Sequence, residues 1–173
     1  MLDDALQPSP APSNSRLNVV LLEPEIPQNT GSIGRLCMAT GCTLHLVKPL
    51  GFKIDAHSLK RAGLDYWEHL DVRVHESTDD FFKSLPSGAR LHLVETRAGR
   101  TLYETHFTRG DYLVFGKETT GIADWILDQY AAALIRIPMF DARVRSLNLS
   151  NAASICVYEA IRQIEFSSSP DPL

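Results

Sequence analysis

The chain has 173 residues, 44% of them hydrophobic, and a formal net charge of −4. The length and composition indicate one globular domain with a substantial core, and the charge disfavours a basic protein that coats nucleic acid. No apolar run is long enough to span a membrane and no signal peptide opens the chain, so we expect a cytoplasmic protein. Ends rich in Pro and Ser predict disordered tails at 1–16 and 167–173, around one domain at 17–166.

In chain order, the first elements are a strand and a helix. Leu17–Leu22 is a short apolar run, typical of a strand that is buried on both faces. The segment Glu23–Gln28 contains two prolines and is predicted to be a loop. Asn29 is then expected to cap a helix that runs to Thr40, where Gly41 ends it.

The rest of the chain continues to alternate between strands and helices. Strands are predicted at Thr43–Val47, Leu70–Val74, Leu91–Glu95, Tyr112–Phe115 and Leu134–Ile137, and helices at His57–Ala62, Asp79–Leu85, Ala123–Gln129 and Leu149–Glu165. Such alternation indicates an α/β fold with a mostly parallel sheet flanked by helices. In sheets of this kind, ligands bind at the loops beyond the carboxyl ends of the strands.

Three polar segments follow strands and are predicted to meet at one site: 29–35, 116–121 and 146–151. In the first, Arg35 lies off the apolar stripe of its helix, where an arginine can reach a phosphate or a developing oxyanion. The simpler alternative is a solvated arginine on a capped helix. The segment is neither a dinucleotide fingerprint nor a P-loop, because the glycine spacing and the Gly-Lys-Ser/Thr are absent.

The second and third segments have two interpretations each. Gly116 can let a ligand approach the backbone while Glu118 orients a partner, or the glycines can simply make a strand-to-helix turn. In the third, a single polar residue would be a helix cap, but the four residues Ser146, Asn148, Ser150 and Asn151 indicate a polar loop that folds back and presents backbone groups to a small ligand. The arginines around this segment form either a basic patch or ordinary solvated surface.

Two further features bear on partners and metals. The last helix is apolar beyond one core face, since it carries Ile155 and Tyr158 in addition, and this favours either deep burial or contact with a second subunit. The cysteines at 37, 42 and 156 lack C-x-x-C spacing and are predicted to be reduced, buried thiols. The histidines and carboxylates show no metal-ligand spacing, so no metal is predicted.

Taken together, the three segments resemble the motifs of the SPOUT superfamily of RNA methyltransferases. The motifs are N-x-G-x-x-x-R, F-G-x-E-x-x-G and I-P-M followed by S-L-N-L-S-N-A, and the resemblance covers Leu17 to Phe166. The opening L-x-E-P-E-I-P-Q-N-T-G and the stretch Arg61–Tyr66 are similar to the TrmL (YibK-like) branch, which methylates the ribose 2′-hydroxyl of the tRNA wobble nucleotide.

The resemblance implies a deep trefoil knot at the carboxyl end, a homodimer and bound S-adenosylmethionine. It assigns Arg35 as the catalytic arginine and implies that the orienting residues are Asn29, Glu118, Ser146 and Asn148. The cofactor-binding residues that it implies are Val94, Glu95, Thr96, Gly116, Ile137, Ser146 and Leu147. For RNA, it implies contacts from Tyr158 and from Arg143 or Arg145, with the tRNA anticodon stem-loop held on the dimer surface.

Two alternatives remain open. The first is a SPOUT 2′-O-methyltransferase that acts on another nucleotide of tRNA or ribosomal RNA. The second is a non-catalytic RNA-binding module on the same scaffold, against which the intact set of candidate catalytic residues argues.

Overall fold

A computed structural model describes residues 15–52 and 67–166. Nearly all of the two predicted tails, the predicted helix His57–Ala62 and the segment Arg61–Tyr66 lie outside the described residues.

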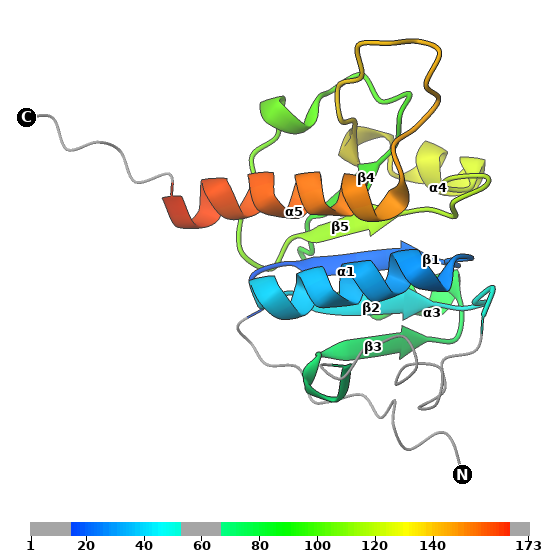
Figure 1. The fold of residues 1–173 in the computed structure, drawn as a ribbon, viewed down its shortest axis with the longest axis vertical. Helices are drawn as coiled ribbons and strands as arrows, with labels where there is room; N and C mark the ends of the chain where they lie inside the picture. The colour runs from blue at the N-terminus through cyan, green and yellow to red at the C-terminus, as the bar shows by residue number, and fades with distance from the viewer. Residues whose placement is uncertain (1–14, 53–66, 167–173) are drawn as a thin grey trace, which may run out of the picture.

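The core is a six-stranded sheet in which every pairing is parallel, as the alternating elements predict (Figure 1). The strands are β1 (Asn18–Leu22), β2 (Thr43–Val47), β3 (Val72–His75), β4 (Leu91–Val94), β5 (Tyr112–Phe115) and β6 (Leu134–Ile135). Their order is β3-β2-β1-β5-β4-β6. The strand order therefore reverses between β1 and β5, and such a switch point is where open parallel sheets bind ligands.

Each face of the sheet has its own layer of helices. Val19 and Leu21 of β1 belong to the core that α1 (Pro27–Thr40) and α5 (Leu149–Phe166) cover, together with the short turn at Trp67–His69. Val20 and Leu22 point to the opposite core, under α3 (Thr78–Lys83) and α4 (Asp124–Gln129). All five residues of β1 are buried, which confirms the prediction of a strand that is buried on both faces.

Helix α1 begins three residues earlier than predicted, and Asn29 is not its cap. Ile26 occupies the cap position with an extended backbone, and Pro27 follows as the first helical residue. Proline suits that position because its fixed φ is helical and its missing N–H would have no partner there. The buried Asn29 side chain is therefore available for tertiary contacts instead of local capping.

Helix α5 lies beside α1 on the same face of the sheet (Figure 1). Of the four polar residues in the third segment, Asn148 caps it: Asn148 Oδ1 accepts hydrogen bonds from the N–H of Ser150 at 3.0 Å and of Asn151 at 3.4 Å. The cysteines at 37, 42 and 156 are free and buried, as predicted. Within the described residues, no helix combines the length and the apolarity needed to cross a membrane.

Candidate active site

A cavity of about 550 Å³ opens beyond the carboxyl ends of β5, β4 and β6. Each of the three polar segments contributes to its lining, through Asn29, 116–121 and 146–149, together with residues that follow β4 and β6. Its lining includes all seven residues predicted to hold the cofactor: Val94, Glu95, Thr96, Gly116, Ile137, Ser146 and Leu147. It also includes Asn29, Glu118 and Asn148 of the predicted orienting group.

Glu118 connects the loop after β5 to the start of α1. Its Oε2 accepts the N–H of Glu25 at 2.8 Å, and its Oε1 accepts the N–H of Ile26 at 3.2 Å and the amide of Asn29 at 3.0 Å. A negative charge at this position satisfies N–H groups at the helix start and complements the helix dipole. The carboxylate thus fixes the first turn of α1 against the cavity.

Asn29 carries this connection on to α5. Its Oδ1 accepts a hydrogen bond of 3.0 Å from the side-chain amide of Asn148, which is the residue that caps α5. Asn148 also accepts the hydroxyl of Ser150 at 2.7 Å. An unbroken chain of hydrogen bonds therefore runs from Glu118 through Asn29 and Asn148 to the amino end of α5.

Two further carboxylates, Glu23 and Glu25, join the same two loops. Here the acceptors lie before α1 and the donors lie after β5. Glu25 Oε2 accepts both the N–H of Thr119 at 3.0 Å and its hydroxyl at 2.7 Å. Lys117 Nζ forms an ion pair with Glu23 at 2.7 Å, and this hydrogen bond raises the pKa of Lys117. Sequence reasoning missed these contacts, because they join residues more than 90 positions apart.

Gly116 is required for the turn that follows β5, which is one of its two predicted roles. A Cβ at this position would lie 2.2 Å from the carbonyl carbon of Gly121 and 2.3 Å from the nitrogen of Ile122. The close approach that the glycine allows is therefore made by the chain's own turn, which returns through Gly121 with φ of 72°. Gly116 also lines the cavity, and the approach of a ligand to its backbone stays a prediction.

The loop between β6 and α5 forms the other side of the cavity. Met139 and Arg145 line it, whereas Arg143 turns away to pair with Asp141. Arg143 Nε lies 3.0 Å from Asp141 Oδ1, and a terminal nitrogen lies 2.5 Å from Oδ2. This pairing lowers the pKa of Asp141 and raises that of Arg143. Of the two candidate arginines, the structure places Arg145 at the cavity.

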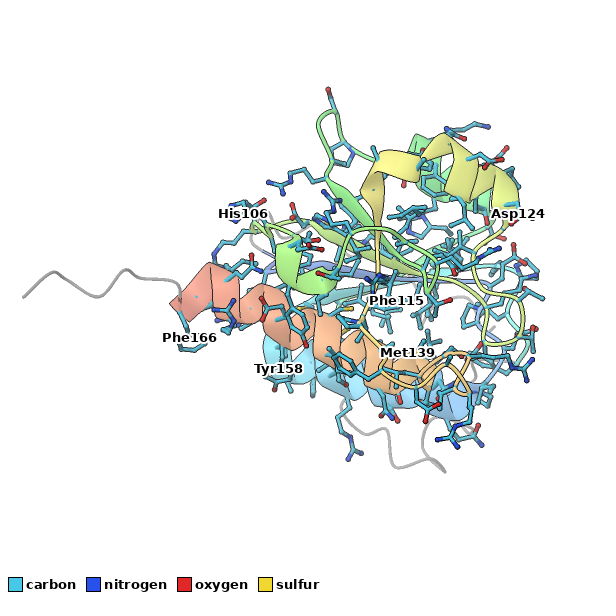
Figure 2. The ribbon with its side chains drawn as sticks, turned by 90° about the horizontal axis from the view of Figure 1, so that it is seen from above. His106, Phe115, Asp124, Met139, Tyr158 and Phe166 are labelled. Carbon is cyan, nitrogen blue, oxygen red and sulfur yellow. The ribbon has the colours of Figure 1, made fainter. Side chains whose placement is uncertain are left out.

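Besides Arg143, two predicted site residues lie outside the cavity lining, Arg35 and Tyr158. Arg35 is exposed on α1, two turns beyond the start of the helix, which confirms its position off the apolar stripe. Tyr158 is 57% exposed near the middle of α5, and Figure 2 shows it apart from Met139 of the preceding loop. The cavity lining also includes Arg97, which belongs to none of the three predicted segments. Within the described residues, no cluster of His, Cys, Asp and Glu is arranged to hold a metal ion.

The arrangement suits a reaction between a small molecule in the cavity and a larger partner at its mouth. The cavity lies within the range of about 300–1,000 Å³ that is typical of small-molecule sites. Its walls combine apolar side chains such as Ile137 and Leu149 with the polar backbone of 116–121. Arg145, at its edge, offers a cation to an anionic partner.

Comparison with known proteins places these features in a family. Residues 16–158 match the SpoU rRNA Methylase family. A tRNA (cytidine(34)-2'-O)-methyltransferase from Saccharophagus degradans is 49% identical over 153 residues, which cover 88% of this chain and 98% of that protein. A protein of the same name from Yersinia pestis is 49% identical over 155 residues, with coverage of 87% and 95%.

Solved structures show the same fold. One, described as "Structural insights into the 2-OH methylation of C/U34 on tRNA", is 47% identical with a TM-score of 0.80, and the match covers 85% of this chain and 95% of that one. An AdoMet-bound rRNA methyltransferase from Sinorhizobium meliloti is 25% identical with a TM-score of 0.76, over 87% and 57% of the two chains. By its matched family and by the identity of these relatives, the chain belongs to the SpoU methylase family, a group of SPOUT RNA methyltransferases.

Proposed function

We propose that this protein transfers a methyl group from S-adenosylmethionine to the ribose 2′-hydroxyl of nucleotide 34 of tRNA, a cytidine or a uridine. The observation that carries the proposal is that residues from three distant polar segments line one cavity beyond the carboxyl ends of the parallel strands. Relatives at 47–49% identity carry a name or a description that states this reaction. The rRNA methyltransferase from Sinorhizobium meliloti is only 25% identical, which favours tRNA over ribosomal RNA as the substrate.

The cavity fits the cofactor. Apolar side chains at Val94, Ile137, Leu147 and Leu149 suit the adenine ring, and the polar backbone of 116–121 suits the ribose and the amino-acid part. Glu95 and Thr96 stand at the same wall, where a carboxylate and a hydroxyl can accept from ribose hydroxyls. When bound there, S-adenosylmethionine supplies an activated methyl group on its sulfonium.

Arg35 is the group that acts on the target ribose. A guanidinium stays protonated in proteins and is a poor base, so its role is to stabilise the alkoxide that develops as the 2′-hydroxyl attacks. Charge-assisted hydrogen bonds from its planar fork serve that purpose and can hold a substrate phosphate at the same time. Because Glu118, Asn29 and Asn148 fix the first turn of α1, they set the position of the helix that carries Arg35. Ser146, at the cavity wall, is placed to orient the ribose.

The finer features of the family follow as parts of the proposal. We infer a homodimer, because α1 and α5 lie side by side and expose Met38, Tyr158 and Phe166 on their outer surface. Light scattering at micromolar concentration that gives the mass of a monomer would contradict it. We also infer the deep trefoil knot at the carboxyl end, the anticodon stem-loop as the bound part of tRNA, and a cytoplasmic location with the tRNA substrate.

The direct test uses purified protein, labelled S-adenosylmethionine and tRNA from cells that lack the modification. We expect label in the ribose of nucleotide 34, located by nuclease digestion and mass spectrometry. Transfer to a different nucleotide would contradict position 34 as the target. Binding of tRNA without any transfer would favour the non-catalytic alternative.

A further inference from the structure

Phe140 is almost wholly exposed, at 99%, which exceeds every other large apolar side chain of the described residues. It lies in the loop that rises between β6 and α5 (orange in Figure 1), directly after the cavity-lining Met139. Isolated apolar residues on a surface are common, but this one stands on a loop whose neighbouring residues form the wall of the site. Its position relative to the cavity is therefore the feature to explain.

The loop that carries Phe140, residues 138–147, has one more positive than negative charge. Arg143 and Arg145 are exposed in the same loop, against the single carboxylate of Asp141, which pairs with Arg143. Among the described residues, Arg145 forms neither a hydrogen bond nor an ion pair with the protein, and it lines the cavity. Arg97 also lines the cavity, but it is paired with Glu95 at 3.6 Å and Asp124 at 3.8 Å and adds no net positive charge.

An exposed aromatic ring beside arginines is the arrangement that binds unpaired nucleotides. Bases of single-stranded RNA stack on aromatic side chains while cations contact the phosphates, and stacking tolerates any base because each has a π-face. A target nucleotide that turns into the cavity leaves the stack of its own strand, and its neighbours then lose a stacking partner. A ring next to the cavity can replace that partner.

We propose that Phe140 is a stacking platform for an unpaired base that neighbours the target nucleotide, with Arg145 on an adjacent phosphate. The inference rests on the proposed function and names how the RNA substrate is held at the same site. Two alternative contacts for Phe140 lead to different predictions. If Phe140 packs against a second copy of the chain, its removal weakens the dimer; if it covers the cofactor, its removal weakens S-adenosylmethionine binding.

The experiment measures binding of an anticodon stem-loop RNA at fixed salt, which does not depend on catalysis. We expect Phe140→Ala to weaken binding roughly tenfold, or about 1.4 kcal/mol, as the loss of one stacked base does. Phe140→Leu should be equally weak, because it keeps the apolar surface without the ring, and Phe140→Trp should bind as well as the wild type. Tyr103→Ala is the matched control, since Tyr103 is 63% exposed but lies outside the cavity lining, and it should have no effect.

A change in the RNA locates the contact. RNAs that carry an abasic site on one or the other side of nucleotide 34 are compared with the intact RNA. For one of them, the losses from the abasic site and from Phe140→Ala should not add, because both remove the same stack. The salt dependence should be unchanged in Phe140→Ala, whereas Arg145→Ala should reduce the slope of log K against log salt by about 0.7.

The outcomes separate this inference from the proposed function. Wild-type protein that methylates tRNA while Phe140→Ala and Phe140→Leu bind RNA normally would overturn the platform alone. Equal losses from Tyr103→Ala, a weaker dimer, or weaker S-adenosylmethionine binding in Phe140→Ala would each overturn it as well. Absence of methyl transfer by a protein that still shows the Phe140-dependent, non-additive RNA binding would overturn the proposed function and leave the platform standing.

Discussion

The two sides of the cavity differ in how they are held. On one side, the loops before α1 and after β5 exchange hydrogen bonds through Glu25 and Glu118, and Asn29 extends the network to α5. On the other side, residues 138–147 are held, within the described part of the chain, mainly by the pairing of Asp141 with Arg143. The difference indicates a rigid side that positions the reacting groups and an open side that contacts the substrate.

The largest effect, on the rate of methyl transfer, is expected from replacing Arg35, which α1 carries on the rigid side. Arg35→Ala should reduce the rate of methyl transfer roughly 100- to 1000-fold, by analogy with removal of an oxyanion donor. The unfolding free energy should change by no more than about 0.5 kcal/mol, as for other exposed positions. Single-turnover transfer to tRNA measures the rate, and calorimetry checks that S-adenosylmethionine binding is intact.

Arg35→Lys is the informative companion. A lysine keeps the charge but lacks the planar fork, so it should restore little of the rate. Near wild-type turnover in either variant would show that Arg35 is an ordinary solvated residue of α1.

The next largest effect is expected from a substitution at the centre of the hydrogen-bond chain from Glu118 to Asn148. Asn29→Ala removes the donor to Glu118 and the acceptor for Asn148 at once. Because these groups lose partners in a partly buried site, we expect a loss of about 1–3 kcal/mol in stability, together with weaker S-adenosylmethionine binding. Urea unfolding and calorimetry measure both, with Asn151→Ala, an exposed asparagine of α5, as the control. If both variants behave alike, the network does not stiffen this side of the cavity.

A smaller effect is expected where the network reaches the surface. Thr119→Val removes the hydroxyl that donates to Glu25 but keeps the backbone N–H. A net hydrogen-bond contribution of about 0.5–1.5 kcal/mol predicts a two- to tenfold loss in S-adenosylmethionine affinity. Thr119→Ser, which retains the hydroxyl, should bind like the wild type, and a loss equal to that of the valine variant would point to the methyl group instead.

The smallest effect concerns the open side. Asp141→Asn weakens the pairing that holds Arg143 and removes a negative charge from the loop. The midpoint of thermal unfolding should not change, because exposed ion pairs contribute little to stability. RNA binding should become slightly tighter, by about two- to threefold, with a steeper salt dependence as one more arginine reaches phosphate. Weaker RNA binding would indicate that the pairing itself shapes the loop for the substrate.

Most of the fold could be predicted from local patterns. The apolar runs at 18–22 and 112–115 are strands because burial on both faces requires an almost continuous apolar sequence. The ends of elements were less predictable: Ile26 rather than Asn29 occupies the cap position of α1, and the last strand stops at Ile135. At such ends, local preferences for capping compete with contacts from distant segments.

The sequence by itself determined the alternation of strands and helices, the family motifs and the polar residues that gather at the site, because these depend on local pattern and residue chemistry. Only the tertiary structure decided how those residues are used. In the folded chain, the side chain of Asn29 forms hydrogen bonds with Glu118 and Asn148, and Gly116 packs against Gly121 and Ile122. Arg145 lines the cavity, whereas Arg143 does not. Each of these depends on the relative placement of segments that are distant along the chain or on the path of a loop, which neither periodicity nor propensity encodes.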